Sequence, residues 1–135
     1  QIAPWVTVEL RGVEAQVHYA NLQAKNFDVG DGAWSADFND AKNYLYLLET
    51  RSREQNYPGY SNAEFDRMVR ESDFELDVVR RGAMMARAEQ LALDEAPICT
   101  SVYINSTNLV HPDLTGYEDN ISDFHRARWF GIKNA

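Results

Sequence analysis

The sequence predicts an α/β fold in which helices flank a small mixed sheet. Residues 6–10 alternate apolar and polar side chains, which is the period of a strand with one buried face. Apolar residues follow one helical face through 13–25, and a segment with two glycines comes next at 27–34. Strand, helix and strand in this order form a βαβ unit, whose parallel strands are joined by a right-handed crossover.

The following segment predicts a helix and then a loop. Asn39 or Asp40 can cap a helix that continues through Glu49, because both side chains accept hydrogen bonds from free backbone amides. The polar segment 51–59 ends in Tyr-Pro-Gly, which is typical of a turn.

Two further helices and a last strand are expected after that loop. Ser61 and Glu64 match a capping box, in which the serine caps a helix and the glutamate reaches back. Residues 76–95 place apolar side chains on one stripe, and Pro97 ends that helix. Alternation returns at 98–104 and predicts a strand. The tail is expected to hold loops with short pieces of structure.

Composition excludes several classes of function. The net charge of −8 disfavours nucleic acid as a partner, because phosphate binding needs clustered Lys and Arg. Cys99 is the single cysteine, so the chain has no disulfide framework and no structural zinc site. The start of the chain lacks a signal-peptide pattern, and no apolar run is long enough to span a bilayer.

Polar and aromatic side chains concentrate in 28–40, just after a predicted parallel strand. Ligands of open α/β sheets bind beyond the carboxyl ends of such strands, which selects Trp34, Ser35, Asp37 and Asn39 as candidates. A carboxylate beside an indole suits an ammonium group.

Other interpretations of this cluster stay open on the residues alone. Asp37 or Asp40 can cap the next helix while Trp34 packs in the core. A bound metal is disfavoured because the EF-hand spacing is absent, and no cofactor is expected. No nucleophile elbow, phosphate loop or Cys–His pattern is present, so the prediction is a protein that is not an enzyme, with a hydrolase as the less favoured alternative.

Four stretches resemble, in the same order, segments of the periplasmic oligopeptide- and dipeptide-binding proteins of ABC importers, the extracellular solute-binding protein family 5: residues 27–40, 59–66, 88–98 and 115–120. The resemblance implies that residues 1–135 are a C-terminal portion, one partial lobe without an internal boundary, of a two-lobed type II periplasmic-binding-protein fold. It also implies a peptide ligand, a membrane permease as partner and a periplasmic location, or a lipid-anchored cell-surface location in a Gram-positive bacterium.

The resemblance also assigns roles to residues. Asp37 matches the aspartate that receives the α-amino group of the peptide, and Trp34, Ser35 and Ala36 match the segment that lines the pocket. Asp31 departs from the pattern, because some relatives carry a basic residue there for the peptide carboxylate. A metal chelate, a sugar or an opine therefore stays an alternative cargo. Because unsupported apolar faces associate, we also expect this fragment to self-associate.

Overall fold

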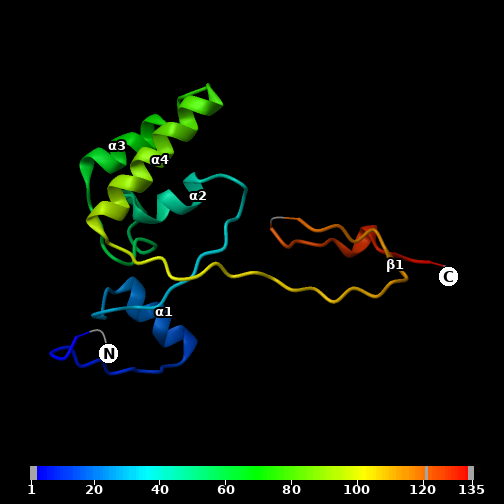
Figure 1. Ribbon diagram of the computed structural model, residues 1–135, viewed down its shortest axis with the longest axis horizontal. Coiled ribbons are helices and arrows are strands. Elements are labelled where there is room, and N and C mark those ends of the chain that lie inside the picture. Colours follow the sequence, from blue (N-terminus) through cyan, green and yellow to red (C-terminus); the bar gives the residue numbers. More distant parts are fainter. Residues whose placement is uncertain (1–2, 121, 134–135) are drawn as a thin grey trace.

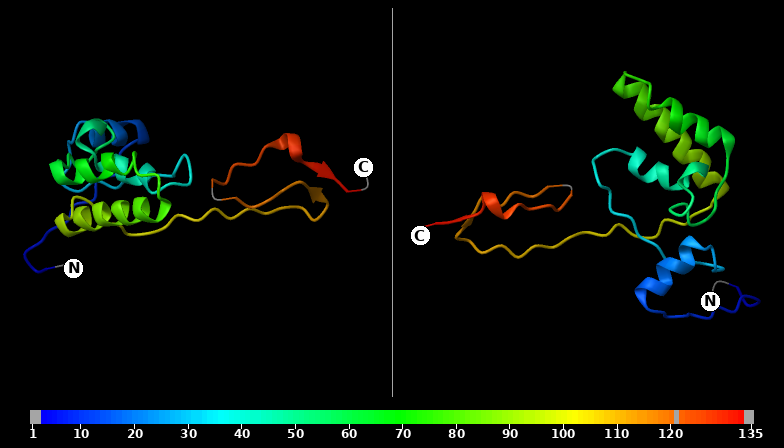
Figure 2. Two further views of the ribbon diagram at one scale, coloured as in Figure 1. Left: turned by 90° about the horizontal axis from the view of Figure 1, so that it is seen from above. Right: turned by 180° about the vertical axis from the view of Figure 1, so that it is seen from behind.

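The computed structural model describes residues 3–120 and 122–133. Its elements are, in order, α1 (Ala15–Gln23), α2 (Lys42–Leu45), η1 (Tyr46–Leu48), η2 (Thr50–Ser52), α3 (Ala63–Glu71), α4 (Val78–Glu95), β1 (Leu114–Thr115), η3 (Ala127–Trp129) and β2 (Gly131–Ile132). Helices α2, α3 and α4 gather in one body, and an extended stretch leads from α4 to the distant β1–β2 hairpin (Figures 1 and 2). Among the described helices, none combines the length and apolarity needed to cross a bilayer.

The hydrophobic core lies where α3 and α4 pack side by side over α2 and η1. Phe65 and Val69 of α3 and Ala88 of α4 have no solvent exposure. Their spacing along each helix places them on the inward stripe of an amphipathic helix. The remaining buried members are Leu45, Leu48, Met68, Met85 and Ala92.

The expected helices form, with small shifts at their ends. The helix expected over 13–25 is α1, and Glu14 caps it through bonds from the amides of Gln16 and Val17. The helix expected to run through Glu49 is shorter, and consists of α2 and η1. The last long helix begins at Val78, behind the cap residue Asp77, and ends before Pro97 as expected.

The capping box expected at Ser61 is wrong by one residue. Asn62 caps α3, because its side-chain oxygen accepts from the amides of Glu64 at 2.9 Å and Phe65 at 3.1 Å. The Asn62 amide group also donates to the Glu95 carboxylate at 2.9 Å, whereas the Ser61 hydroxyl accepts from the Thr50 hydroxyl. Both residue types cap helices well, so the contact with Glu95 at the end of α4 selects between them.

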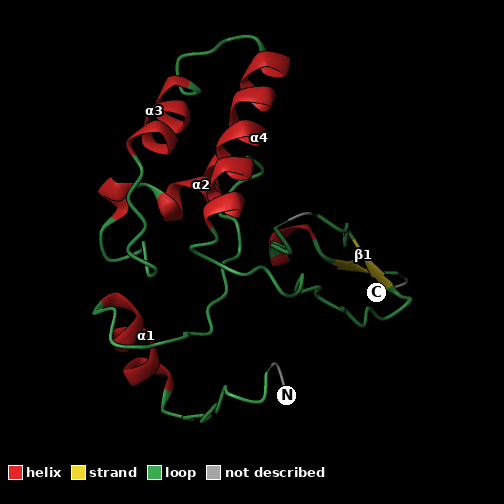
Figure 3. Cartoon of the chain, turned by 60° about the vertical axis from the view of Figure 1, so that its left-hand side comes forward, coloured by secondary structure: helices red, strands yellow, loops and turns green. Residues whose placement is uncertain are grey.

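The strands expected at 6–10, 27–34 and 98–104 are wrong, because these segments form no strand and the βαβ unit is absent (Figure 3). The two-stranded sheet of the described residues is β1–β2, which is antiparallel and pairs Leu114 with Ile132. Alternation favours an extended backbone, but a strand also needs a neighbour for its amides and carbonyls. The alternating side chains are accordingly exposed, Leu10 by 92% and Val102 by 79%.

The identity of the α3 cap can be tested by substitution. We expect Asn62→Ala to lower the free energy of unfolding by about 1–2 kcal/mol, because two backbone amides lose their acceptor. Ser61→Ala is the matched control and should change it by less than about 0.5 kcal/mol. Urea denaturation followed by circular dichroism measures both variants, and equal losses would show that the cap is misassigned.

Candidate ligand-binding site

A pocket of about 290 Å³ lies between the loop that follows Trp34 and the first turns of α2 and η1. Its lining residues are Trp34, Asp37, Phe38, Lys42, Asn43, Tyr46 and Gln55. The loop supplies an indole, a carboxylate and a phenyl ring, and the helical segment supplies the polar groups that face them. The pocket is open on one side, so it forms a wall for a ligand rather than an enclosure.

Asp37 and Asp40 have different surroundings, which separates the two functions that the sequence left open. The Asp40 carboxylate accepts from the Lys42 amide at 2.9 Å and so satisfies a free amide at the start of α2. The Asp37 carboxylate is exposed on the pocket wall and accepts from the Asn43 side-chain amide at 3.4 Å. The Asp40 carboxylate is therefore engaged at the start of α2, whereas the Asp37 carboxylate is exposed on the pocket wall.

The other predicted site residues divide between two places. Trp34 lines the same pocket as Asp37, and 36% of its surface is exposed. Ser35 lines a second, polar pocket of about 430 Å³, whose other lining residues are Ile104, Asn105, Ser106, Asn108, Asp119, Asn120, Ser122 and Asp123. Ala36 and Asn39 line neither of these two pockets. The structure thus brings together Trp34 and Asp37 but not the full predicted set.

Asn43 is the buried residue of this pocket that sequence reasoning missed. Only 7% of it is exposed, and its side-chain oxygen accepts from the Trp34 indole N–H at 2.7 Å and from the Asp37 amide at 3.3 Å. The usable signal was an asparagine directly before the apolar and aromatic run 44–48, because such a residue needs partners for its amide when it is buried.

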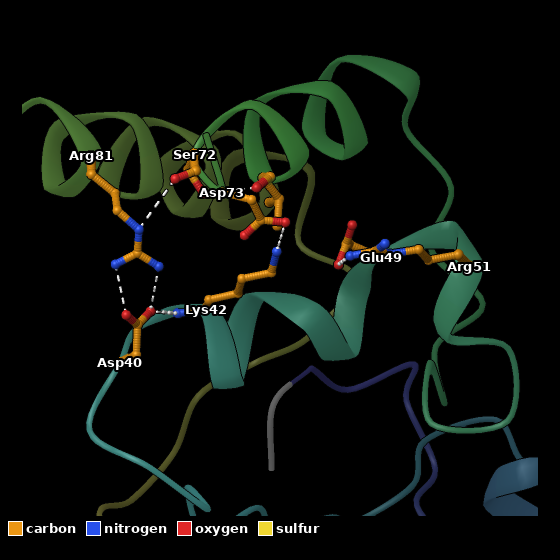
Figure 4. A network of polar contacts seen from close by, with 8 residues as sticks. Asp40, Lys42, Glu49, Arg51, Ser72, Asp73 and Arg81 are labelled. Atoms are coloured by element: carbon orange, nitrogen blue, oxygen red, sulfur yellow. Dashed lines mark hydrogen bonds and ion pairs between the residues drawn. The ribbon is translucent and has the colours of Figure 1, made fainter. Parts of the chain in front are cut away.

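An ion pair between Asp40 and Arg81 links the end of the loop that carries Trp34 to α4 (Figure 4). The Arg81 guanidinium donates hydrogen bonds to both carboxylate oxygens of Asp40, at 2.6 and 3.0 Å. It also donates to the Ser72 carbonyl at 3.2 Å. The hydrogen bond from Arg81 lowers the pKa of Asp40, against the opposing effect of partial burial. The neighbouring Arg80 is exposed, whereas Arg81 is half-buried and forms this ion pair.

The charge on the pocket wall is set by a second ion pair. Lys42 lines the pocket, but its ammonium group pairs with Asp73, which lies just after α3 (Figure 4). Because that ammonium group is already engaged, Lys42 does not neutralise Asp37. The wall therefore offers an exposed carboxylate beside two aromatic side chains, Trp34 and Phe38, which suits a group that is positively charged and partly apolar.

No protein-family model matches the chain, but individual proteins do. It is 30% identical to the oligopeptide-binding protein OppA of Bacillus subtilis (strain 168), over 82% of this chain and 20% of that protein. It is 29% identical to the periplasmic murein peptide-binding protein MppA of Escherichia coli (strain K12), over 85% of this chain and 21% of that protein. The chain is homologous to the bacterial oligopeptide- and dipeptide-binding proteins.

A solved structure extends this homology to the fold. The unliganded open form of the periplasmic murein tripeptide binding protein MppA matches 94% of this chain and 25% of its own, with a TM-score of 0.74 and 29% identity. The expected fold class, part of a lobe of a periplasmic binding protein, is confirmed by this neighbour. The chain spans between a fifth and a quarter of the length of these relatives, in agreement with the fragment of a family 5 solute-binding protein that the sequence predicts.

The clamp between Asp40 and Arg81 can be tested through its pH dependence. We expect Arg81→Met to lower the free energy of unfolding by about 1–2 kcal/mol at neutral pH, whereas the exposed neighbour Arg80→Met should have little effect. Because the pKa of folded Asp40 lies below its ordinary value of 3.8, the pair contributes fully above pH 3.8 and is lost as the pH falls further. The difference between wild type and Arg81→Met should therefore shrink in acid, and a constant difference would contradict the clamp.

Proposed function

We propose that the protein that carries this chain is the substrate-binding component of an ABC importer and captures peptides. The observation that carries the proposal is the exposed Asp37 carboxylate on a pocket wall beside the Trp34 indole. A peptide presents an ammonium group at its first residue, and a hydrogen bond from this group to a carboxylate contributes about 1.5–3 kcal/mol. The indole face adds an attraction for the same positive charge.

The names of the homologues support a peptide as the cargo. The relative from Bacillus subtilis is named for oligopeptides, and the solved neighbour is named for a murein tripeptide. Homologues from Escherichia coli, Haemophilus influenzae and Salmonella typhimurium are named as periplasmic proteins. These names support a periplasmic location, and we propose that the protein works there, or on the cell surface with a lipid anchor in a Gram-positive host, and delivers its ligand to a membrane permease.

The proposed activity is binding without chemistry. The homologues are named as binding proteins, which supports a receptor rather than an enzyme. In this proposal the open wall around Asp37 is one side of a cleft, and a second lobe closes over the ligand by a hinge motion. The roles of Ser35, Ala36 and Asn39 in that cleft stay predictions, and Ser35 would act from the neighbouring polar pocket.

A non-peptide cargo is the second candidate, and one homologue favours it. The chain is 27% identical, over 93% of its length, to a protein of Escherichia coli (strain K12) named as a probable deoxycholate-binding periplasmic protein. A largely apolar cargo would use the rings of Trp34, Phe38 and Tyr46 and would not need Asp37. The two candidates therefore differ in whether affinity depends on the carboxylate.

This difference gives a direct test in the full-length protein. We expect Asp37→Asn to weaken the binding of peptides with a free amino terminus about tenfold or more, because the ammonium group loses its charged acceptor. The matched control is Asp28→Asn, which removes the same charge from the same segment at an exposed position outside both pockets. Isothermal titration calorimetry measures both variants, and an unchanged affinity in Asp37→Asn would reject the ammonium site.

Self-association of the isolated chain is a further expectation that the exposed apolar side chains support. The side chains of Val8, Leu10, Val102 and Ile104 are exposed, and they lie on segments that form neither helix nor strand. Exposed apolar side chains on such segments favour association with other chains. Light scattering on residues 1–135 should therefore detect dimers or larger species, and a monodisperse monomer would refute this expectation.

A further inference from the structure

We propose that Asn43 is a positioning residue for ligand binding, which holds the Trp34 indole and the Asp37 carboxylate in one fixed arrangement. The proposal rests on the function proposed above and deepens it, because it adds a residue that would set the geometry of the ammonium site without being its charged group.

The side-chain amide of Asn43 has contacts at both of its ends. Its oxygen accepts hydrogen bonds from the indole N–H of Trp34 at 2.7 Å and from the backbone N–H of Asp37 at 3.3 Å. Its nitrogen donates to the Asp37 carboxylate at 3.4 Å. One buried side chain therefore contacts the aromatic group, the charged group and the backbone between them.

These partners fix the orientation of the amide. Two N–H donors approach the oxygen and a carboxylate approaches the nitrogen, so a flipped amide would place its own NH₂ group against both donors. No second orientation satisfies the set. Asn43 thereby restrains the rotation of Trp34 about its side-chain bonds and keeps the Asp37 carboxylate beside the pocket.

The backbone of Asn43 is itself held in place. Its amide donates to the Asp40 carbonyl at 3.0 Å, and the Asp40 carboxylate is gripped by Arg81 of α4. The restraint therefore passes from the helical core through Asp40 to Asn43, and from Asn43 to the two groups that face a ligand. A binding wall positioned in this way loses less conformational freedom when a ligand arrives.

The test separates the acceptor function of Asn43 from a merely structural one. Full-length protein is labelled with ¹⁵N-tryptophan, and the Trp34 indole signal is assigned by its absence in Trp34→Phe. In Asn43→Ala we expect the Trp34 indole N–H to exchange with solvent up to about tenfold faster, which is the loss of one neutral hydrogen bond. Asn43→Asp is made together with Asp37→Asn, so that an acceptor oxygen stays near the indole without setting two carboxylates against each other; in this double variant the indole should remain protected.

The control and the opposing outcomes are defined on the same samples. Asn26→Ala removes an exposed asparagine that bonds Asn21, and it should leave the Trp34 signal unchanged. An unchanged exchange rate of the Trp34 indole N–H in Asn43→Ala overturns the proposal. Equal loss of protection in Asn43→Ala and in the Asn43→Asp, Asp37→Asn double variant also overturns it, because that indicates general loosening. If Asn43→Ala does not fold, Asn43→Ser replaces it, since the serine hydroxyl is too short to reach the indole.

Ligand affinity distinguishes a failure of this proposal from a failure of the proposed function. Calorimetry compares trialanine with N-acetyl-trialanine, and Asn43→Ala should weaken the free peptide several-fold while changing the acetylated peptide less, because only the free peptide uses Asp37. A wild-type protein that binds neither peptide contradicts the peptide function, and the indole exchange rates then support or overturn the role of Asn43 by themselves.

Discussion

The site depends on the ion pair that joins Asp40 to Arg81. Two parallel hydrogen bonds between a guanidinium and a carboxylate restrict direction as well as distance, so the pair sets how the loop enters α2. The same carboxylate satisfies the first turn of that helix. Because Arg81 belongs to α4, the longest helix of the described residues, the loop that carries Trp34 and Asp37 is attached to the best-packed part of the molecule.

A second set of contacts joins the C-terminal end of α4 to the segment before α3. The Tyr60 hydroxyl donates to the Glu95 carboxylate at 2.7 Å, and the Tyr60 ring packs edge-on against Phe65 of the core. Burial, together with the bond to Glu95, raises the pKa of Tyr60 to about 12, so this hydroxyl stays protonated and keeps donating. The ends of α4 are thus tied to different loops, one beside the site and one beside the α3 cap.

The sequence predicted the helices well and the sheet badly, for a physical reason. A helix satisfies its own backbone, so local periodicity and a nearby cap such as Asp77 are enough to place it. A strand needs a neighbouring strand for its backbone hydrogen bonds, and the alternation of apolar and polar side chains at 6–10 does not show whether one is present. The argument that selected Trp34 and Asp37 assumed a parallel strand that does not form, yet both residues line one pocket. Asn43 and Arg81 escaped prediction because their partners lie 9 and 41 residues away.

The open shape of the pocket explains why a rigid wall matters. Ligand pockets cover most of the surface of a bound molecule, and a one-sided hollow of about 290 Å³ cannot do so alone. In the proposed receptor, a ligand would first meet this one prepared surface and would then be covered by the other lobe, so closure would supply the remaining contacts. If the first surface had to be ordered at the same time, that entropy cost would reduce the affinity gained on closure. The interactions that fix Trp34 and Asp37 before a ligand arrives therefore matter more in an open wall than in a closed cavity.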